Sequence, residues 1–181
     1  MKNERNEAIH GDDQVDGIHG RSLVTEKTSE AHSQAVQKIA TAFQKSVAVT
    51  SGKEQVFSEN VLLCCNERDR DEENRFSPDL MVVRNDKDIK DDGVHSVPVF
   101  VAEITTMASR RIDYGEKMLT YLEIGVDEYW VVDLDRKVVM RYLLSEDYAP
   151  EAFAYPSYEG LSVYTHPLVE IDLAQVFGTI V

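Results

Sequence analysis

Cysteine is scarce in this chain of 181 residues, and its two cysteines do not form a metal-binding motif. Cys64 and Cys65 are adjacent, so on a strand their side chains point to opposite faces and cannot easily form a disulfide bond with each other. The sequence has no Cys-x-x-Cys pattern, which argues against a structural zinc site. Two free thiols, together with an N-terminus that has no apolar leader, predict a reducing cytoplasm as the location of the protein.

Long hydrophobic runs are also absent. The longest of them, such as residues 97–102, fall far short of the about 20 apolar residues that a transmembrane helix needs. We therefore expect no interaction with a membrane. Hydrophobic residues make up 43% and charged residues 29% of the sequence, which is typical of a globular domain with its own core.

Basic residues are in the minority, since 19 lysines and arginines stand against 33 aspartates and glutamates, giving a net charge of −14. A protein that binds nucleic acid through many phosphates usually presents a basic face, so this charge counts against nucleic-acid binding. Any such contact must come from a local patch, a metal ion or transient binding. A glycine-rich phosphate loop, a Gly-x-Ser-x-Gly turn and a recognisable DNA-reading motif are missing as well.

The hydrophobic pattern predicts an α/β domain. Residues 1–20 are polar without periodicity and are predicted to form a flexible N-terminal arm, followed by one domain over residues 21–181. Apolar residues at three- and four-residue spacing predict an amphipathic helix from residue 28 or 29 to about residue 50. A second helix is expected to end at Gly125. Strands are predicted over residues 21–26, 55–65, 76–83, 98–104, 128–134, 137–144 and 161–164, and a short helix over 173–177. This order gives a mixed sheet flanked by helices.

Two carboxylates and an amine stand out in the stretch over residues 75–133, which is predicted as strand, loop, strand, helix and strand. Asp79 begins the first of these strands, Glu103 lies near the end of the second, and Lys117 follows on the helix. Carboxylates on neighbouring strands with a nearby amine can hold a hard divalent cation and stabilise a phosphate oxyanion. Asp79 could equally cap a turn, and Glu103, set among apolar residues, needs either a functional partner or an ion pair.

The second helix carries further polar residues. Asp113, Lys117 and Tyr121 lie at i, i+4 and i+8 and so share one face, which taken alone fits a surface ion pair beside a half-buried tyrosine. Arg110 and Arg111 stand at the start of the helix, where the helix dipole disfavours cations. They would fit there if they face a phosphate, or if they reach into solvent.

Several segments in a fixed order resemble a known family: PDLMVV, VPVFVAEITT, RRIDYGEKMLTYLEIGVDEYWVVD, and the late GLSV and IDLAQVF. They are similar to the Uma-type (Uma-two) family of restriction-endonuclease-like proteins, in the PD-(D/E)XK nuclease superfamily. The similarity is strong from about residue 76 to residue 133, fair at the C-terminal end and weak before the first helix. It implies a restriction-endonuclease-like α/β core with a central mixed sheet. It also implies Mg²⁺-dependent (or Mn²⁺-dependent) hydrolysis of nucleic-acid phosphodiesters, with DNA as the expected substrate.

The resemblance also implies roles for the acidic residues. Asp79 looks like the aspartate of the P-D half-motif and Glu103 like the acid of the second half-motif, so both would bind the metal ion, together with the Ile104 carbonyl. The superfamily has a lysine two residues after the second acid, where this chain has Thr105. Lys117 on the following helix matches the position that is thought to take over this role in the family, so Asp79, Glu103 and Lys117 are the expected catalytic residues.

The helix would then support this site. Asp113 and Tyr121 are expected to position Lys117, and Arg110 and Arg111 are the best candidates for contacting the phosphate backbone. Double-strand cleavage needs two sites, so a homodimer is expected.

Two other functions stay open. The net charge and Thr105 favour a catalytically inactive member that keeps the fold as an interaction or regulatory module. A metal-dependent hydrolase with a substrate other than polymeric nucleic acid is the third possibility. Metal affinity separates the nuclease from the interaction module, and substrate profiling separates it from the other hydrolase.

Overall fold

A computed structural model describes residues 14–18, 21–25, 29–50, 54–65, 74–84 and 88–178. The helices are α1 (Glu30–Thr50), the π-helical turn η1 (Ile112–Lys117), α2 (Met118–Ile124) and α3 (Leu173–Phe177). The strands are β1 (Gln14–Ile18), β2 (Arg21–Thr25), β3 (Gln55–Ser58), β4 (Leu63–Cys65), β5 (Asn74–Phe76), β6 (Leu80–Val83), β7 (Ile89–Lys90), β8 (Gly93–Val94), β9 (Phe100–Thr105), β10 (Glu128–Asp133), β11 (Val138–Leu143), β12 (Glu151–Ala154), β13 (Gly160–Ser162) and β14 (Glu170–Asp172).

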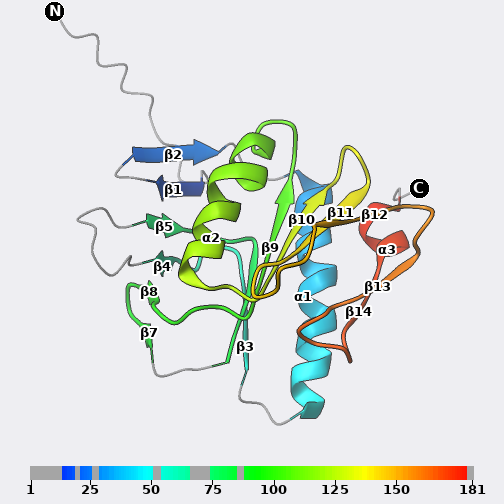
Figure 1. The fold of residues 1–181 in the computed structure, drawn as a ribbon, viewed down its shortest axis with the longest axis horizontal. Helices are drawn as coiled ribbons and strands as arrows, with labels where there is room; N and C mark the ends of the chain where they lie inside the picture. Colours follow the sequence, from blue (N-terminus) through cyan, green and yellow to red (C-terminus); the bar gives the residue numbers. More distant parts are fainter. Residues whose placement is uncertain are drawn as a thin grey trace, which may run out of the picture.

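The central sheet has the order β12-β11-β10-β9-β6-β3. Only β9 and β10 run parallel in it, and its other neighbouring strands are antiparallel. A parallel pair needs a crossover connection, which η1 and α2 supply. Figure 1 shows α1 and α2 on opposite sides of this sheet, with α3, β13 and β14 on the α1 side. The predicted mixed sheet flanked by helices is confirmed.

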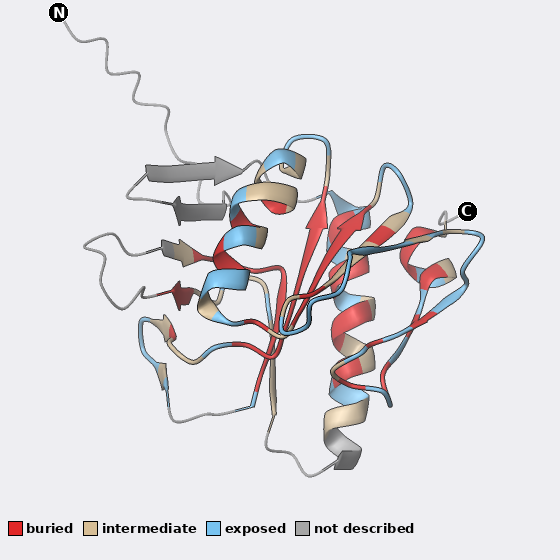
Figure 2. Ribbon diagram, in the orientation of Figure 1, coloured by how far each residue is buried: buried red, intermediate tan, exposed pale blue. Residues whose placement is uncertain are grey.

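Side chains alternate between the two faces of the central strands, and this divides the hydrophobic core into two clusters, one on each face of the sheet. Phe100, Ala102 and Ile104 of β9 pack in one hydrophobic cluster with α1, while Val101 packs in a second cluster with α2. Because side chains alternate between the two faces of a sheet, Glu103 lies on the same face as Val101 and is directed toward α2. The strands β9 and β10 are buried along their whole length (Figure 2). The nearly continuous apolar run over residues 98–104 is typical of a strand that is buried on both faces.

A second sheet, with the order β2-β1-β5-β4-β8-β7, lies beside the first on the α2 side (Figure 1). Its presence corrects two predicted strands. Residues 55–65 form β3 and β4 in different sheets, because Glu59 and Asn60 adopt positive φ angles of 47° and 60° and turn the chain. Residues 76–83 are likewise broken at Ser77–Asp79, where Pro78 cannot donate a backbone hydrogen bond to a sheet.

Part of the predicted N-terminal arm forms a strand. Residues 14–18 form β1, which pairs antiparallel with β2 in five register positions, although their sequence, QVDGI, shows no hydrophobic alternation. Backbone hydrogen bonding to the adjacent strand explains a strand that the side-chain pattern does not indicate. The predicted strand over residues 21–26 is confirmed as β2, and residues 1–13 lie outside the described residues.

The predicted helices agree with the structure. The first begins at Glu30, Gly125 ends α2 in a left-handed conformation, and α3 spans Leu173–Phe177 as expected. Both cysteines are buried, and neither forms a disulfide bond. Among the helices that the structure describes, none combines the length and apolar character needed to cross a membrane.

Candidate active site

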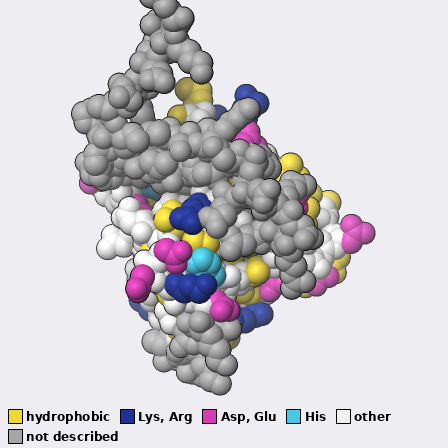
Figure 3. All heavy atoms as spheres, turned by 90° about the vertical axis from the view of Figure 1, so that its left-hand side faces the viewer, with side chains coloured by type: hydrophobic (Ala, Val, Ile, Leu, Met, Phe, Trp, Pro, Cys, Tyr) yellow, Lys and Arg dark blue, Asp and Glu magenta, His cyan; other side chains and the backbone are white. Residues whose placement is uncertain are grey.

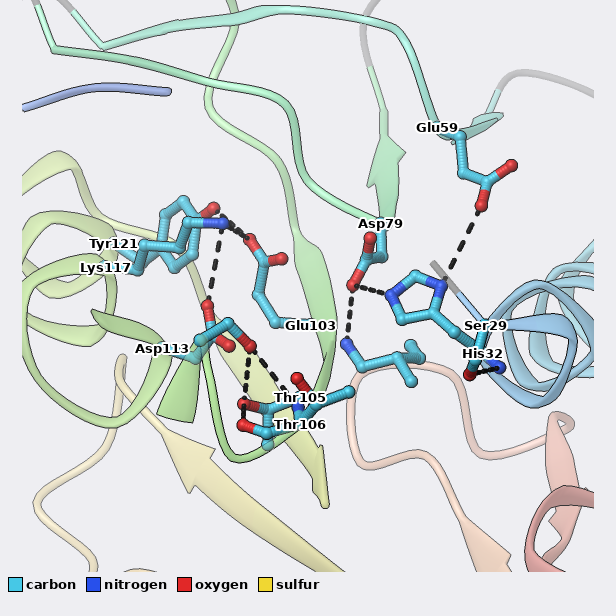
Figure 4. Close-up of polar contacts among 12 residues, drawn as sticks. Ser29, His32, Glu59, Asp79, Glu103, Thr105, Thr106, Asp113, Lys117 and Tyr121 are labelled. Carbon is cyan, nitrogen blue, oxygen red and sulfur yellow. Dashed lines mark hydrogen bonds and ion pairs between the residues drawn. The ribbon is translucent and has the colours of Figure 1, made fainter. Parts of the chain in front are cut away.

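The two predicted metal-binding carboxylates come together at the edge between β6 and β9. Leu80 pairs with Ala102 at the end of this antiparallel ladder, and Asp79 directly precedes Leu80 while Glu103 directly follows Ala102. Both residues are buried, since Asp79 is 5% exposed and Glu103 is 2% exposed. The structure therefore brings together the two acids that the sequence singled out (Figure 4).

Asp79 is held from two directions. Its Oδ2 accepts a hydrogen bond from the backbone N–H of Ile104 at 2.7 Å and lies 3.1 Å from Nε2 of His32. His32 comes from α1, on the opposite side of the sheet from α2. The structure thus links Ile104 to the site through its amide, whereas the predicted metal-binding role of its carbonyl stays a prediction.

Glu103 is held from the α2 side. Its Oε1 accepts a hydrogen bond from the Tyr121 hydroxyl at 2.7 Å and lies 3.1 Å from the Lys117 ammonium. Figure 4 shows the Glu103 carboxylate directed toward these two side chains and the Asp79 carboxylate directed toward His32. Glu103 therefore has the ion pair that a buried carboxylate requires, and Tyr121 positions Glu103 directly.

The ammonium of Lys117 also lies 3.6 Å from Oδ1 of Asp113, one turn earlier in η1. Burial raises the pKa of Asp113, although Lys117 and hydrogen bonds with the Ser109 and Thr105 side chains act in the opposite direction. Thr105, at the superfamily's usual lysine position, thus supports the acid that holds Lys117. Asp113, Lys117 and Tyr121 share a face as predicted, but they are buried, so the surface-pair interpretation is wrong.

A π-helical turn places these groups. Such turns are rare and occur frequently at functional sites. The η1 turn is fixed by the Tyr129 hydroxyl, which donates a hydrogen bond to the Asp113 carbonyl at 2.9 Å. Burial and the negative charge of Glu103 raise the pKa of both Tyr121 and Tyr129 well above 10, so both hydroxyls remain protonated donors at neutral pH.

His32 is the residue that the sequence reasoning missed. Its position near the start of α1 suggests a helix-end histidine, but it is 5% exposed and in contact with Asp79. Within the described part of the chain its Nδ1 has no hydrogen-bond partner and lies 4.0 Å from Glu59. One signal was available, because His32 precedes Ala35 and Val36 by three and four residues and so belongs to the apolar stripe of α1. A histidine there is buried against the sheet.

Among the described residues, the cluster contains more buried acidic than basic side chains. Asp79, Glu103 and Asp113 are opposed by the ammonium of Lys117 and by His32 when it is protonated. Burying charge is costly without compensation, so the cluster suits a divalent cation next to Asp79 and Glu103. Carboxylate oxygens are the ligands that hard cations such as Mg²⁺ prefer.

The two arginines at the start of the second helix differ. Arg110 makes a bidentate pair with the buried Asp133, at 2.8 and 2.9 Å, and a contact of 3.2 Å with Asp135. Burial alone would raise the pKa of Asp133, but Arg110 outweighs it and lowers that pKa. Arg111 is exposed. The structure therefore places Arg110 in an ion pair between helix and sheet and leaves Arg111 at the surface.

The contact between His32 and Asp79 makes a pH-dependent prediction. Burial lowers the pKa of His32, but the hydrogen bond and charge of Asp79 outweigh it, so the pKa lies above 6.5. The protonated histidine then stabilises the folded state fully below pH 6.5, and this contribution is lost as the pH rises through the folded-state pKa. We expect the difference in unfolding free energy between wild type and His32→Gln, measured in urea, to shrink as the pH rises.

His166 provides the matched control. Burial lowers the pKa of His166, so its contribution to stability falls as the pH falls. The difference between wild type and His166→Gln should therefore change with pH in the opposite direction. A His32→Gln difference that stays constant with pH would contradict the assigned contact.

Comparisons with known proteins identify the fold and the family of the chain. The crystal structure of a protein from Anabaena variabilis, described as "a putative nuclease belonging to DUF820", superposes with a TM-score of 0.69 at 16% sequence identity, over 90% of this chain and 89% of that chain. The chain thus has the fold of a nuclease-like protein, as the resemblance implied. No curated protein matches the chain. The model of the Uma2 family, described as "Putative restriction endonuclease", matches residues 4–174, so the chain belongs to this family.

Proposed function

We propose that this protein is a metal-dependent endonuclease that hydrolyses phosphodiester bonds of nucleic acid, with DNA as its substrate and Mg²⁺ (or Mn²⁺) as its cofactor. The observation that carries the proposal is that Asp79 and Glu103 directly flank the paired residues Leu80 and Ala102, with the Lys117 ammonium 3.1 Å from Glu103. Two acids that can hold a cation and an amine that can stabilise an oxyanion are suited to phosphodiester hydrolysis. Membership in the Uma2 family supports the same reaction.

Asp79 and Glu103 would hold the cation, with the Ile104 carbonyl as a further oxygen ligand. When bound, the cation supplies a water of lowered pKa and offsets charge on the phosphate. The Ile104 amide and His32 fix the orientation of Asp79, and Tyr121 fixes that of Glu103. Fixed ligand orientation raises metal affinity.

Lys117 stabilises the negative charge that develops on the phosphate oxygens in the transition state. Asp113 and Glu103 hold its ammonium, so no reorganisation is needed when that charge develops. Arg111 is the better candidate for contacting the phosphate backbone, because Arg110 could do so only by leaving Asp133. We also propose a homodimer, since double-strand cleavage needs two sites. We further propose a reducing compartment such as the cytoplasm, where two cysteines outside disulfide bonds are stable.

A second candidate is an interaction module without catalytic activity. Two observations favour it. The Glu103–Lys117 ion pair already satisfies both buried charges, and the net charge of −14 opposes broad contact with phosphates.

Cleavage assays decide between these functions. Supercoiled plasmid and single-stranded DNA are incubated with wild type in Mg²⁺, Mn²⁺ or EDTA. We expect nicking that needs the metal and falls at least about 100-fold in Asp79→Asn, since removing one group that organises a transition state costs that much. Asp147→Asn, an exposed aspartate in a turn, is the matched control and should keep full activity. If the protein neither cleaves DNA nor binds metal in calorimetry, the interaction module is supported. Metal binding without cleavage would indicate another substrate.

A further inference from the structure

A second group of metal-ligating side chains lies in the smaller sheet. Cys64 lies on β4, Asp92 in the turn between β7 and β8, and His95 directly after β8. One donor atom from each, a thiol sulfur, a carboxylate oxygen and an imidazole nitrogen, lies within 4.8 Å of the other two. This cluster contains neither Asp79 nor Glu103, and no step of the proposed nuclease reaction uses it.

The fold brings the three ligands together by laying the β7–β8 hairpin against β4. Leu63 pairs in parallel with Val94, and the Val94 amide donates to the Leu62 carbonyl at 2.8 Å. Gly93 makes this approach possible. It has a φ of +141°, and a β-carbon at this position would lie 2.5 Å from the Leu62 carbonyl oxygen and 3.2 Å from the Cys64 sulfur. Only glycine avoids both the strain and the overlap.

Alternation along β4 selects Cys64 over its neighbour. Leu63 and Cys65 point into the hydrophobic cluster beneath α2, so Cys64 points to the other face of the strand. Cys65 is packed within that cluster, at 2% exposed. The two adjacent cysteines thus have separate environments, and only Cys64 has a histidine and a carboxylate at hand.

The buried Cys64 and the more exposed Asp92 and His95 already lie close together. His95 Nε2 lies 2.9 Å from Oδ1 of Asp92, and the Cys64 thiol is 3.9 Å from the Asp92 carbonyl oxygen. The side chain of Asp92 is 55% exposed and that of His95 17%, so a cation can enter from solvent. Figure 3 shows the face that bears β7 and β8, on which a histidine lies among acidic and basic side chains.

We propose that Cys64, Asp92 and His95 form a zinc site with three protein ligands and a water molecule in the fourth position. Zinc bonds of about 2.0–2.3 Å in a tetrahedron separate ligand atoms by about 3.2–3.7 Å, so the three donor atoms need only small shifts. Thiolate and imidazole favour Zn²⁺ over Mg²⁺, which distinguishes this site from the oxygen donors at Asp79 and Glu103. The sequence concealed the site because its ligands come from segments about 30 residues apart without Cys-x-x-Cys spacing.

The test is zinc binding by the full chain, prepared without a histidine tag. Zinc affinity is measured by competition with a chromophoric chelator, and Co²⁺ is used to detect the charge-transfer absorption of a thiolate ligand. Loss of a partner that merely orients a ligand weakens metal binding about 10- to 100-fold, so loss of a direct ligand in Cys64→Ser or His95→Ala should weaken it by more than about 100-fold. Cys65→Ser is the matched control and should change the affinity by less than about 3-fold.

Two further variants make the result unambiguous. Asp79→Asn should bind zinc at this site as wild type does, whether or not it cleaves DNA, so failure of the nuclease proposal leaves this one intact. Asp92→Asn changes an exposed side chain and should weaken zinc binding without unfolding the protein if Cys64→Ser fails to fold. Affinity unchanged in His95→Ala and Asp92→Asn, or Co²⁺ binding without thiolate absorption in wild type, would overturn the proposal.

Discussion

Replacing Glu103 with glutamine is expected to abolish metal binding at the candidate active site and to lower DNA cleavage at least about 100-fold. Glutamine keeps the hydrogen bond from Tyr121 but removes the carboxylate that the cation needs. Lys117→Met should also lower cleavage at least about 100-fold, yet it should keep metal binding, because it leaves both carboxylates in place. Calorimetry of Mg²⁺ or Mn²⁺ binding and plasmid nicking together separate these two roles.

The control for Glu103→Gln is Glu123→Gln, the same change at an exposed position of α2, which should alter neither property. Removing Lys117 leaves Glu103 and Asp113 without their shared cation, so Lys117→Met must be shown to be folded under assay conditions. Cleavage that survives in a folded Lys117→Met variant would remove Lys117 from the mechanism. Metal binding retained at full affinity by Glu103→Gln would remove Glu103 from the metal site.

The largest loss of stability is expected from Glu128, the first residue of β10. Its carboxylate is fully buried and accepts hydrogen bonds from the Trp130 indole, the Tyr164 amide, and the amide and hydroxyl of Thr165. Glu128→Ala leaves these four donors without their acceptor in the interior. Each unsatisfied buried group costs about 1–3 kcal/mol, and breaking a buried charged network costs about 3–5 kcal/mol in total.

We therefore expect Glu128→Ala to lower the unfolding free energy by about 3–5 kcal/mol, measured by urea denaturation. Glu128→Gln should also be destabilising. Its NH₂ group replaces one carboxylate oxygen, so two of the four donors face another donor and lose their acceptor. Glu170→Ala, an exposed glutamate on β14, is the control and should change the free energy by less than about 0.5 kcal/mol. A loss below about 1 kcal/mol in Glu128→Ala would show that water replaces the carboxylate.

Sequence alone singled out Asp79, Glu103 and Lys117, three charged residues that the structure buries. A glutamate inside an otherwise apolar strand marks a costly burial, and the four-residue spacing of Asp113, Lys117 and Tyr121 places them on one helix face. The structure adds that all three are buried and that the turn between Asp113 and Lys117 is π-helical. The sequence does not predict the π-helical turn, because the four-residue spacing of these side chains fits an ordinary α-helix equally well.

Contacts between distant segments account for what was missed. His32 and Asp79 are 47 residues apart, and the partner of Arg110 lies 23 residues further along the chain. No local pattern encodes such pairs. The division of residues 55–65 was missed because Glu59 and Asn60 turn the chain without a glycine or proline.

The hydrogen bonds to Glu128 have a consequence for local unfolding. They fasten the chain at Tyr164 and Thr165 to the strand next to β9, while the residues of β13, β14 and α3 share one core with α1 and the central sheet. The C-terminal segment therefore cannot detach without opening the layer that supports Asp79 and Glu103. Its amide hydrogens should exchange with solvent together with those of the central sheet, so β13, β14 and α3 form one cooperative unit with the candidate active site.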